Sequence, residues 1–444
     1  MRNGGKNHTK LVALTTIAIV VFVVDATVNL KRGESVAHER TAKENFREDF
    51  SKRVYYVGDQ VWRIYKHNDS VNDLVEQHDQ NGSYQIWSNH PLTVDIFVRS
   101  RMLYNVDLLL NNCRIKYEVL IKDVQKAIDD GNVRLTTAME AELEGRKGHR
   151  MEWTSYHELN DIYGYLDYLA NTYPDVCSVQ SIGNSIEGQP LKVLRISNGR
   201  TNAPAIWIDG GIHAREWISP AAVTYIIDYL VENSDVLQTD YYILPVANPD
   251  GYRYTFKYDR LWRKNRRKGT LCSGVDLNRN FGYRWGGQGT SSNMCYETYR
   301  GSKAFSEPET NAIRNFFENS LANYKAYISF HSYGQYILYP WGYDQRLPPD
   351  YRDLDAVGLE AAEYMKYEGG DNTKYIVGNS AITLYPAAGG SDDWAKALLK
   401  IKYAYTIELR DTGKYGFLLP PQYIIPTAKE ALAAIKVITS AIRK

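Results

Sequence analysis

Short strands and short helices alternate in the first third of this chain, ahead of residue 150. Between Val54 and about Asp130, apolar positions recur with a period of two in some stretches and with a period near 3.6 in others. The expected strands are 59–65, 92–98 and 117–121, and the expected helices are 70–77, 103–110 and a short one after residue 121. This arrangement predicts a small α+β domain of its own.

A different pattern begins after Trp153, where apolar strands alternate with longer amphipathic helices. We expect strands over 191–196, 205–209, 241–246, 326–330 and 403–409, and helices over 159–173, 220–233, 308–321, 356–367 and 426–442. Such alternation is typical of a mixed, mostly parallel twisted sheet with helices on both faces. Ligands of these sheets bind beyond the carboxyl ends of the strands, so we expect the functional residues there.

The segment between these two parts has the composition of a processing linker. Residues 138–150 are acidic and helical at first, then basic and interrupted by glycine. Arg146, Lys147 and Arg150 are candidate cleavage sites for an activating trypsin-like protease. We therefore expect a removable pro-segment over 27–150 and a complete domain over 151–444. An ordinary interdomain linker is the alternative.

The first 26 residues resemble a secretory signal peptide. Arg2, Lys6 and Lys10 precede an uncharged, mostly apolar run, and small residues stand at the usual cleavage positions before Thr27. The run is shorter than the roughly 20 residues that span a bilayer, which leaves an uncleaved signal anchor as the alternative. We expect a secreted monomer without stable membrane association.

Composition and charge exclude several classes of protein. Hydrophobic residues make up 44% of the chain and charged residues 24%, which excludes disordered, collagen-like and coiled-coil proteins. Lys and Arg number 53 against 52 Asp and Glu, so no overall field attracts nucleic acid. The basic run over 260–268 resembles a nucleic-acid patch by itself, but secretion and the balanced charge favour a solvated loop.

Four cysteines suggest few disulfides and a core that does not depend on them. Cys272 and Cys295 lie in one Gly- and Asn-rich stretch, and this is the pair that we expect to be joined. Cys113 and Cys177 fall in different domains, so we expect two free, buried thiols.

Two histidines and a glutamate stand where the predicted strands end. His213 and Glu216 follow the strand 205–209, and their spacing of three places both side chains on one face of a helical turn. His331 directly follows the strand 326–330. Together they form the His₂Glu set of catalytic zinc sites, with the fourth position left for water. A structural His–Glu pair is the alternative.

Further polar residues stand near these strand ends. Glu408 lies near the end of an apolar strand, where a carboxylate is costly to bury unless it is paired or functional. Asp276 is a candidate to orient a histidine ligand through its second ring nitrogen. Arg263, Asn278 and Arg279 are donors in a loop-rich stretch, and arginine is suited to bind a carboxylate through two hydrogen bonds.

Six motifs resemble one known family. They are HAREW at 213–217, LWRKNRR at 261–267, CSGVDLNRNF at 272–281, FHSYGQ at 330–335, YPAAGGSDDW at 385–394 and IELRDTGKYGFLLP at 407–420. From about Ser155 onward the chain resembles the zinc metallocarboxypeptidases of the digestive A/B type, and the preceding segment is similar to their ferredoxin-like activation domain. The resemblance implies a secreted, zinc-dependent exopeptidase made as a zymogen, with one zinc per chain.

The resemblance also implies a role for each matching residue. The zinc ligands would be His213, Glu216 and His331. Glu408 would be the general base, taking a proton from water and passing it to the leaving amine, and Arg263 would polarise the carbonyl. The substrate's terminal carboxylate would be held by Asn278, Arg279 and Tyr385, the outer subsites would be lined by Arg215, Arg260, Tyr333 and Phe417, and the family's cysteine pair matches Cys272 and Cys295.

Four features bear on substrate preference. Asp392 stands where the B-type enzymes carry an aspartate on the floor of the specificity pocket, which implies a preference for C-terminal Lys or Arg. Ser380 replaces a glycine that we expect in B-type enzymes, and the loop over 396–400 is one residue longer than usual. Asp393 is expected to point away from the pocket. A preference for apolar or aromatic residues, as in the A-type enzymes, is the alternative.

Two other functions fit the same fold. One is an inactive secreted binding protein, which the intact set of motifs argues against. The other is a hydrolase of N-acyl amino acids, because related zinc folds act on such compounds. The pro-segment and the carboxylate-binding set favour the C-termini of peptides or proteins as substrates.

Overall fold

The computed structural model describes residues 53–66, 71, 74–75, 82–131 and 135–443, all within one compact unit. The expected signal peptide over residues 1–26 lies outside the described residues, as does most of the helix expected over 70–77. None of the helices in the described part of the chain combines the length and the apolar composition of a membrane span.

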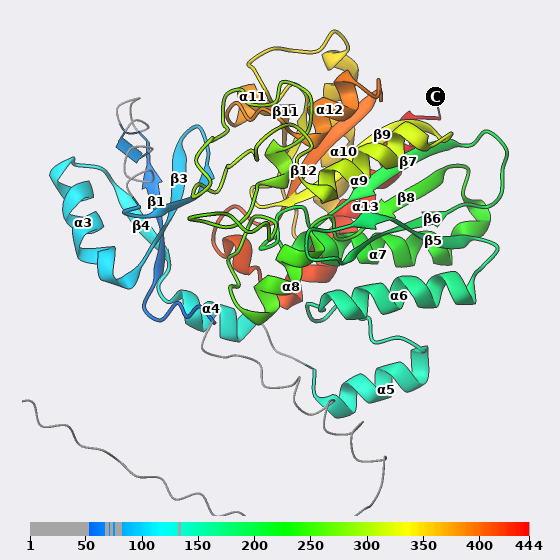
Figure 1. The fold of residues 1–444 in the computed structure, drawn as a ribbon, viewed down its shortest axis with the longest axis horizontal. Coiled ribbons are helices and arrows are strands. Elements are labelled where there is room, and N and C mark those ends of the chain that lie inside the picture. Colours follow the sequence, from blue (N-terminus) through cyan, green and yellow to red (C-terminus); the bar gives the residue numbers. More distant parts are fainter. Residues whose placement is uncertain (1–52, 67–70, 72–73, 76–81, 132–134, 444) are drawn as a thin grey trace, which may run out of the picture. The chain divides into compact units, whose positions relative to one another are not determined.

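The N-terminal part is an α+β domain, as the sequence predicts (Figure 1). Its elements are β1 (Gln60–Tyr65), β2 (Gln85–Asn89), β3 (Thr93–Val98), α3 (Leu103–Asn112), β4 (Tyr117–Ile121) and α4 (Val124–Gly131), followed by α5 (Thr137–Lys147). The four-stranded sheet has the order β2-β3-β1-β4 and pairs antiparallel throughout. Helical residues lie between β1 and β2, and α3 lies between β3 and β4, so the topology is ferredoxin-like.

Both faces of this small sheet are buried. Trp62 and Ile64 of β1 pack with Val106 of α3 on one face. Val61 and Phe97 belong to a second cluster on the other face, together with side chains of the later domain, among them Leu261, Tyr333, Phe417 and Leu418. The small sheet therefore contributes apolar surface to an interface with the rest of the chain.

The larger part is built on an eight-stranded sheet of order β11-β10-β12-β9-β7-β8-β6-β5. Its strands are β5 (Cys177–Asn184), β6 (Pro190–Ile196), β7 (Pro204–Asp209), β8 (Asp240–Leu244), β9 (Asn323–Ser332), β10 (Tyr336–Tyr339), β11 (Ile376–Asn379) and β12 (Tyr403–Leu409). The central strands β12, β9, β7 and β8 pair parallel, as do β10 and β11, while β10–β12, β6–β8 and β5–β6 pair antiparallel. The expected mixed, mostly parallel sheet is confirmed.

Helices cover both faces of this sheet (Figure 1). They are α6 (Leu159–Thr172), α7 (Ile218–Glu232), α8 (Pro249–Lys257), α9 (Pro308–Asn319), α10 (Tyr351–Glu368), α11 (Ser380–Thr383), α12 (Ser391–Ala397) and α13 (Ile424–Ala441). Successive residues of β7 show the two sides. Ile206 and Ile208 pack in the cluster that includes α6, α7, α10 and α13, whereas Trp207 packs with α9 and α12.

The parallel strands β7, β9 and β12 present their carboxyl ends at one edge of the sheet. β9 is longer than expected and runs through His331 to Ser332. Glu408 pairs in register with His331 across β12 and β9. The metal-ligand candidates and Glu408 are thus brought to the same edge.

Cys272 and Cys295 form a disulfide with Cα atoms 5.0 Å apart, as expected from the sequence. Cys177 is a free, buried thiol. The expectation that Cys113 is also buried is wrong, because it follows the exposed C-terminal end of α3.

Ile208 tests the burial of the central sheet. It is fully buried in β7, whereas Ile376 in the edge strand β11 is 54% exposed. Ile208→Ala should lower the free energy of unfolding by about 2–5 kcal/mol, because it leaves a cavity that its neighbours cannot fill. Ile376→Ala should change it by no more than about 0.5 kcal/mol. Comparable losses of thermal stability in the two variants would contradict this assignment.

Candidate active site

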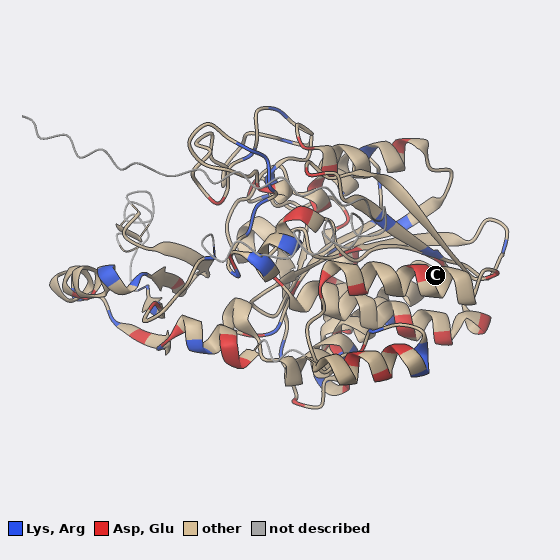
Figure 2. Cartoon of the chain, turned by 60° about the horizontal axis from the view of Figure 1, so that its bottom comes forward, with Lys and Arg blue, Asp and Glu red and all other residues tan. Residues whose placement is uncertain are grey.

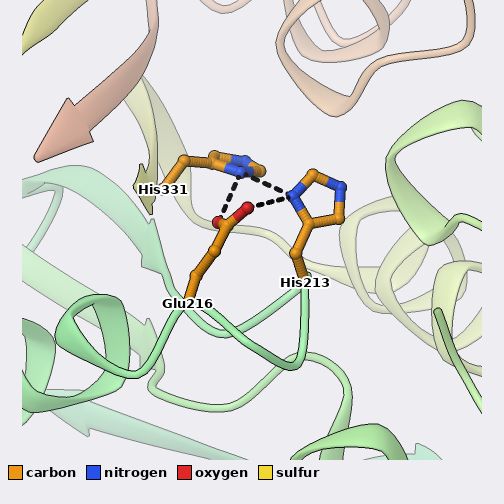
Figure 3. A group of neighbouring side chains, drawn as sticks. All are labelled: His213, Glu216 and His331. Atoms are coloured by element: carbon orange, nitrogen blue, oxygen red, sulfur yellow. Dashed lines mark hydrogen bonds and ion pairs between the residues drawn. The ribbon is translucent and has the colours of Figure 1, made fainter. Parts of the chain in front are cut away.

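His213, Glu216 and His331 form a buried group whose ligand atoms all lie within 4.8 Å of one another (Figure 3). Nδ1 of His213 is 2.8 Å from Glu216 Oε1, and Nδ1 of His331 is 3.2 Å from Glu216 Oε2. The two Nδ1 atoms are 3.1 Å apart. The backbone N–H of Ser332 donates to Glu216 Oε2 and helps to orient the carboxylate.

A tight turn after β7 positions the first two members of this group. Gly211 has φ +64°, and a Cβ atom there would lie 2.9 Å from Pro220 Cγ. Glycine is required for this turn, because other residues rarely adopt this conformation and their side chains would collide. The turn directs His213 and Glu216 over the ends of the strands before α7 begins.

The outer nitrogens of both histidines are fixed by hydrogen bonds. His213 Nε2 lies 3.1 Å from Asp276 Oδ1, and an ionised carboxylate only accepts, so we assign the proton to Nε2. Ser329 donates to Asp209 Oδ1 at 2.6 Å, which leaves its oxygen to accept from His331 Nε2 at 3.2 Å. Both Nδ1 atoms therefore present lone pairs to the centre of the group.

These residues fit a zinc ion. Two nitrogen lone pairs and a carboxylate converge in a buried space, where their mutual repulsion is relieved by a cation. Two imidazoles and one carboxylate are also the donor set of many catalytic zinc sites. The group is thus placed to bind a metal ion, as the spacing in the sequence predicts.

Asp276 links the metal group to Arg263. Its Oδ2 accepts from Arg263 Nη2 at 2.9 Å and from Nε at 3.2 Å, while its Oδ1 lies beside His213. Burial opposes ionisation of Asp276, but the nearby Arg263 and His213 hold its pKa well below the usual value. Asp276 therefore remains a carboxylate that orients both side chains.

The pair Asp209 and Ser329 was not identified in the sequence. Trp207 Nε1 donates to Asp209 Oδ2 at 2.7 Å, and burial raises the pKa of this carboxyl. The available signal was an acid at the end of an apolar strand, immediately before the Gly210–Gly211 turn. Such second partners fix the ring orientation of a metal-binding histidine.

Glu408 lines the same cavity as the metal group. Burial raises its pKa to about 7; the nearby His331 and Arg263 oppose this shift, and Glu216 adds to it. A carboxyl group with such a pKa can take up and release a proton near neutral pH.

Asn278, Arg279 and Tyr385 also line this cavity. Arg279 donates from Nε to the Gly289 carbonyl at 2.9 Å and from Nη1 to the Asn278 carbonyl at 3.0 Å. These bonds fix the guanidinium in the cavity wall. Tyr385 is more exposed than the other two.

Asp392 and Asp393 differ in their surroundings. Asp392 is 6% exposed and lines the cavity together with Ser380, Gly390 and Thr406, and burial raises its pKa. The Asp393 carboxylate accepts from the backbone N–H groups of Gly342 and Tyr343, both at 2.8 Å. The Asp393 carboxylate therefore fixes the loop at Gly342.

Four further side chains had been assigned to the outer subsites, and they differ in position. Tyr333 and Phe417 pack edge to face and line the cavity. The Arg215 guanidinium stacks on the Phe417 ring at 4.2 Å. Arg260 donates to the backbone carbonyls of Arg215 and Phe417 and stacks on a tryptophan ring. Among the described residues around the cavity, Arg260 therefore supports the wall rather than lining it.

The N-terminal α+β domain closes one side of the cavity. Residues 87–90, at the end of β2, are among the residues that line it. Asp95 of β3 accepts from the Tyr333 hydroxyl at 2.9 Å and forms an ion pair with Arg63, which in turn donates to the Thr412 carbonyl at 2.6 Å. His90 Nδ1 lies 3.0 Å from the Tyr336 hydroxyl.

The basic run over 260–268 is not the solvated loop that the sequence suggested. Arg263 reaches the metal group, Lys264 is buried and donates to the Met294 carbonyl, and Arg267 pairs with the buried Glu307. Figure 2 shows acidic and basic residues interspersed along the helices. Arg263, Lys264 and Arg267 therefore use their charges within the domain, whereas Lys268 is exposed.

Comparison with known proteins agrees with this geometry. Residues 162–434 match the family model described as zinc carboxypeptidase, and residues 62–131 match the carboxypeptidase activation peptide. These two matches fall on the eight-stranded and four-stranded sheets, respectively.

Individual relatives include both specificity types. Carboxypeptidase B of Astacus astacus is 47% identical over 66% of this chain and 99% of its own length. Carboxypeptidase A4 of Mus musculus is 40% identical over 88% of this chain and 95% of its own length. The crystal structure of thrombin activatable fibrinolysis inhibitor superposes with a TM-score of 0.78 at 37% identity, covering 87% of this chain and 99% of the other.

The two family matches, the identity to these relatives and the His–Glu–His group lead to one assignment. This chain belongs to the zinc carboxypeptidase family and carries that family's activation peptide ahead of the enzyme domain.

Proposed function

We propose that this zinc carboxypeptidase removes lysine and arginine from the C-termini of peptides or proteins. We further propose that it is secreted as a zymogen, and that a trypsin-like protease removes the pro-segment, which lies within residues 27–150, by cutting near Arg146, Lys147 or Arg150. The observation that carries the specificity is the buried Asp392 carboxylate in the wall of the cavity that holds the metal group.

The environment of Asp392 supports a basic substrate. A lysine or arginine side chain must lose its water when it enters the cavity, and an anion at the end of its path offsets that cost. Asp393 is already bonded to two backbone N–H groups, which leaves Asp392 as the acid available to a ligand. Burial disfavours a lone Asp392 anion, so a cationic side chain is its natural partner.

Ser380 supports a limit on the size of the substrate side chain that enters the cavity. It begins α11, donates to the Tyr339 carbonyl at 3.2 Å and lines the cavity near Asp392. A hydroxymethyl group in the wall leaves less room than a glycine would. We propose that this narrows the pocket and favours lysine over the bulkier arginine.

The positions of Glu408 and Arg263 in the cavity support the catalytic roles that we propose for them. When bound, zinc supplies polarisation of the scissile carbonyl and lowers the pKa of a water molecule. Glu408 takes the proton of the attacking water and later gives it to the leaving amine. Arg263, held by Asp276, presents its charge to the developing oxyanion.

Arg279 and Asn278 support action at chain ends. Arg279 is buried and fixed by two backbone carbonyls, so a carboxylate can meet its guanidinium without reorganisation. An internal peptide bond would leave this charge without a partner in a desolvated site. The same pair favours the C-termini of peptides or proteins as substrates.

The aspartate variants test the specificity. Asp392→Ala should lose on the order of 30-fold or more in kcat/KM for C-terminal Lys and Arg, as expected for a lost buried charge pair worth about 2–5 kcal/mol. Its activity on C-terminal Leu and Phe should be kept or increased. Asp393→Asn should instead lower stability while leaving the ratio of Lys to Leu hydrolysis unchanged. A wild-type enzyme that prefers Phe or Leu would establish the A-type alternative.

Glu408→Gln tests the general base. We expect kcat to fall by roughly 10²–10⁴-fold while bound zinc remains at the wild-type level, because glutamine cannot accept the proton. Retention of wild-type kcat would contradict the role.

The pH profile reports the same group in the wild-type enzyme. A raised pKa means that Glu408 becomes protonated at a higher pH than an ordinary carboxyl group, so its base function is lost as the pH falls through about 7. Bound zinc favours the carboxylate form of Glu408, so in the zinc-loaded enzyme the fall of activity on the acidic side of the profile moves to lower pH. An activity plateau extending below the ordinary glutamate range, near pH 4.3, would contradict the assignment.

Asp95→Ala tests the capping of the cavity. It removes the acceptor of Tyr333 and the partner of Arg63, so the uncut chain should hydrolyse small peptides at least severalfold faster than the uncut wild type. Asp130→Ala is the control, because Asp130 pairs only with the exposed Lys126 among the described residues. Equal activities of the two uncut variants would argue against capping through Asp95.

A further inference from the structure

The structure distinguishes between the three candidate processing sites at the end of the pro-segment. We infer that the activating cut follows Arg146 or Lys147, and that residues 148–150 remain on the enzyme domain as an N-terminal strap. This inference deepens the proposed zymogen function and rests on it.

Helix α5 is suited to proteolysis at its C-terminal end. It has no buried residue, and the Arg146 side chain is 67% exposed in an ion pair with the equally open Glu142. Lys147 is exposed as well. A short helix without a buried face unwinds at little cost, and a protease needs the chain in an extended form.

Helix α5 ends at Gly148, and from this residue onward the chain contacts α6. This residue ends α5 with φ +72°, and a Cβ atom there would lie 2.8 Å from Cε2 of Tyr168 on α6. The His149 ring lies 4.7 Å from the ring of Tyr165 and 4.8 Å from that of Tyr168. From Gly148 onward, therefore, the segment is packed on the enzyme domain.

Arg150 and Met151 are held on both sides of the bond that joins them, and the Arg150 side chain is 39% exposed, less than the 67% of Arg146. Arg150 Nη1 lies 3.2 Å from Asp161 Oδ1 of α6, and Nη2 lies 2.9 Å from Glu140 Oε1 of α5. Met151 is 2% exposed and belongs to the main core. Presenting the bond between them to a protease requires breaking two ion pairs and withdrawing a core side chain.

Arg150 thus links two helices by ion pairs and is not the cleavage site. It joins α5 to α6 in the uncut chain through Glu140 and Asp161. A cut after Arg146 or Lys147 releases Glu140 with the pro-segment, whereas Asp161 still holds Arg150. The strap then covers the same part of α6 before and after activation.

Limited trypsin digestion of the full-length chain tests this inference. The intact mass and N-terminal sequence of the enzyme fragment should identify Lys147 or Gly148 as its first residue at the earliest time points. Arg146→Gln/Lys147→Gln should slow the appearance of the fragment by tenfold or more. Arg150→Gln should leave the position of the cut unchanged and increase the rate of cleavage, because α5 loses its ion pair with Arg150.

An early fragment that begins at Met151 would overturn the inference, as would normal processing of Arg146→Gln/Lys147→Gln through Arg150. Arg150→Gln that blocks processing would overturn it too. Fragment mass and peptidase activity are measured separately. A fragment with the expected N-terminus but no activity would refute the proposed function, and an active fragment beginning at Met151 would refute only the processing site.

Discussion

Two histidine nitrogens with lone pairs and one carboxylate face each other in a buried space at the end of the central sheet, and a cation is needed to make that arrangement favourable. The parallel strands β7 and β9 bring the three groups there, and β12 adds Glu408 beside His331. Asp276 and the Asp209–Ser329 pair then fix the ring nitrogens on the far side. These contacts hold the side chains so that their lone pairs converge on one point.

The activation domain can control the enzyme because it packs beside the edge of the sheet that carries the metal group. Its small sheet buries one face on its own helix and contributes the other to a cluster that contains Tyr333 and Phe417. Asp95 adds a polar contact to the Tyr333 hydroxyl at the mouth of the cavity. Packing of the two domains therefore restricts access to the metal group. The two core clusters on the faces of the eight-stranded sheet include no described residue ahead of Met151.

The sequence predicted the features that depend on local pattern. The apolar strand 205–209 and the spacing of His213 and Glu216 identified two ligands, and His331 followed from its place after another apolar strand. The sequence did not reveal β2, β5, β10 or β11. Three of these strands have only four or five residues, and the eight residues of β5 are mostly polar, so each carries too little apolar periodicity. The hydrogen bond from Tyr333 to Asp95 joins residues more than 200 positions apart, which no local pattern can show. Cys113 was misjudged for a related reason, since its exposure depends on how the end of α3 meets solvent.

Metal analysis of the purified chain tests the central claim most directly. Elemental analysis after dialysis should find one zinc per wild-type chain, and His331→Ala, folded as judged by circular dichroism, should retain far less. A matched substitution of a histidine outside the group, His149→Ala, should keep its full zinc content. Wild-type protein that binds no zinc at saturating metal, or a His331→Ala variant that binds it as tightly as the wild type, would contradict the account.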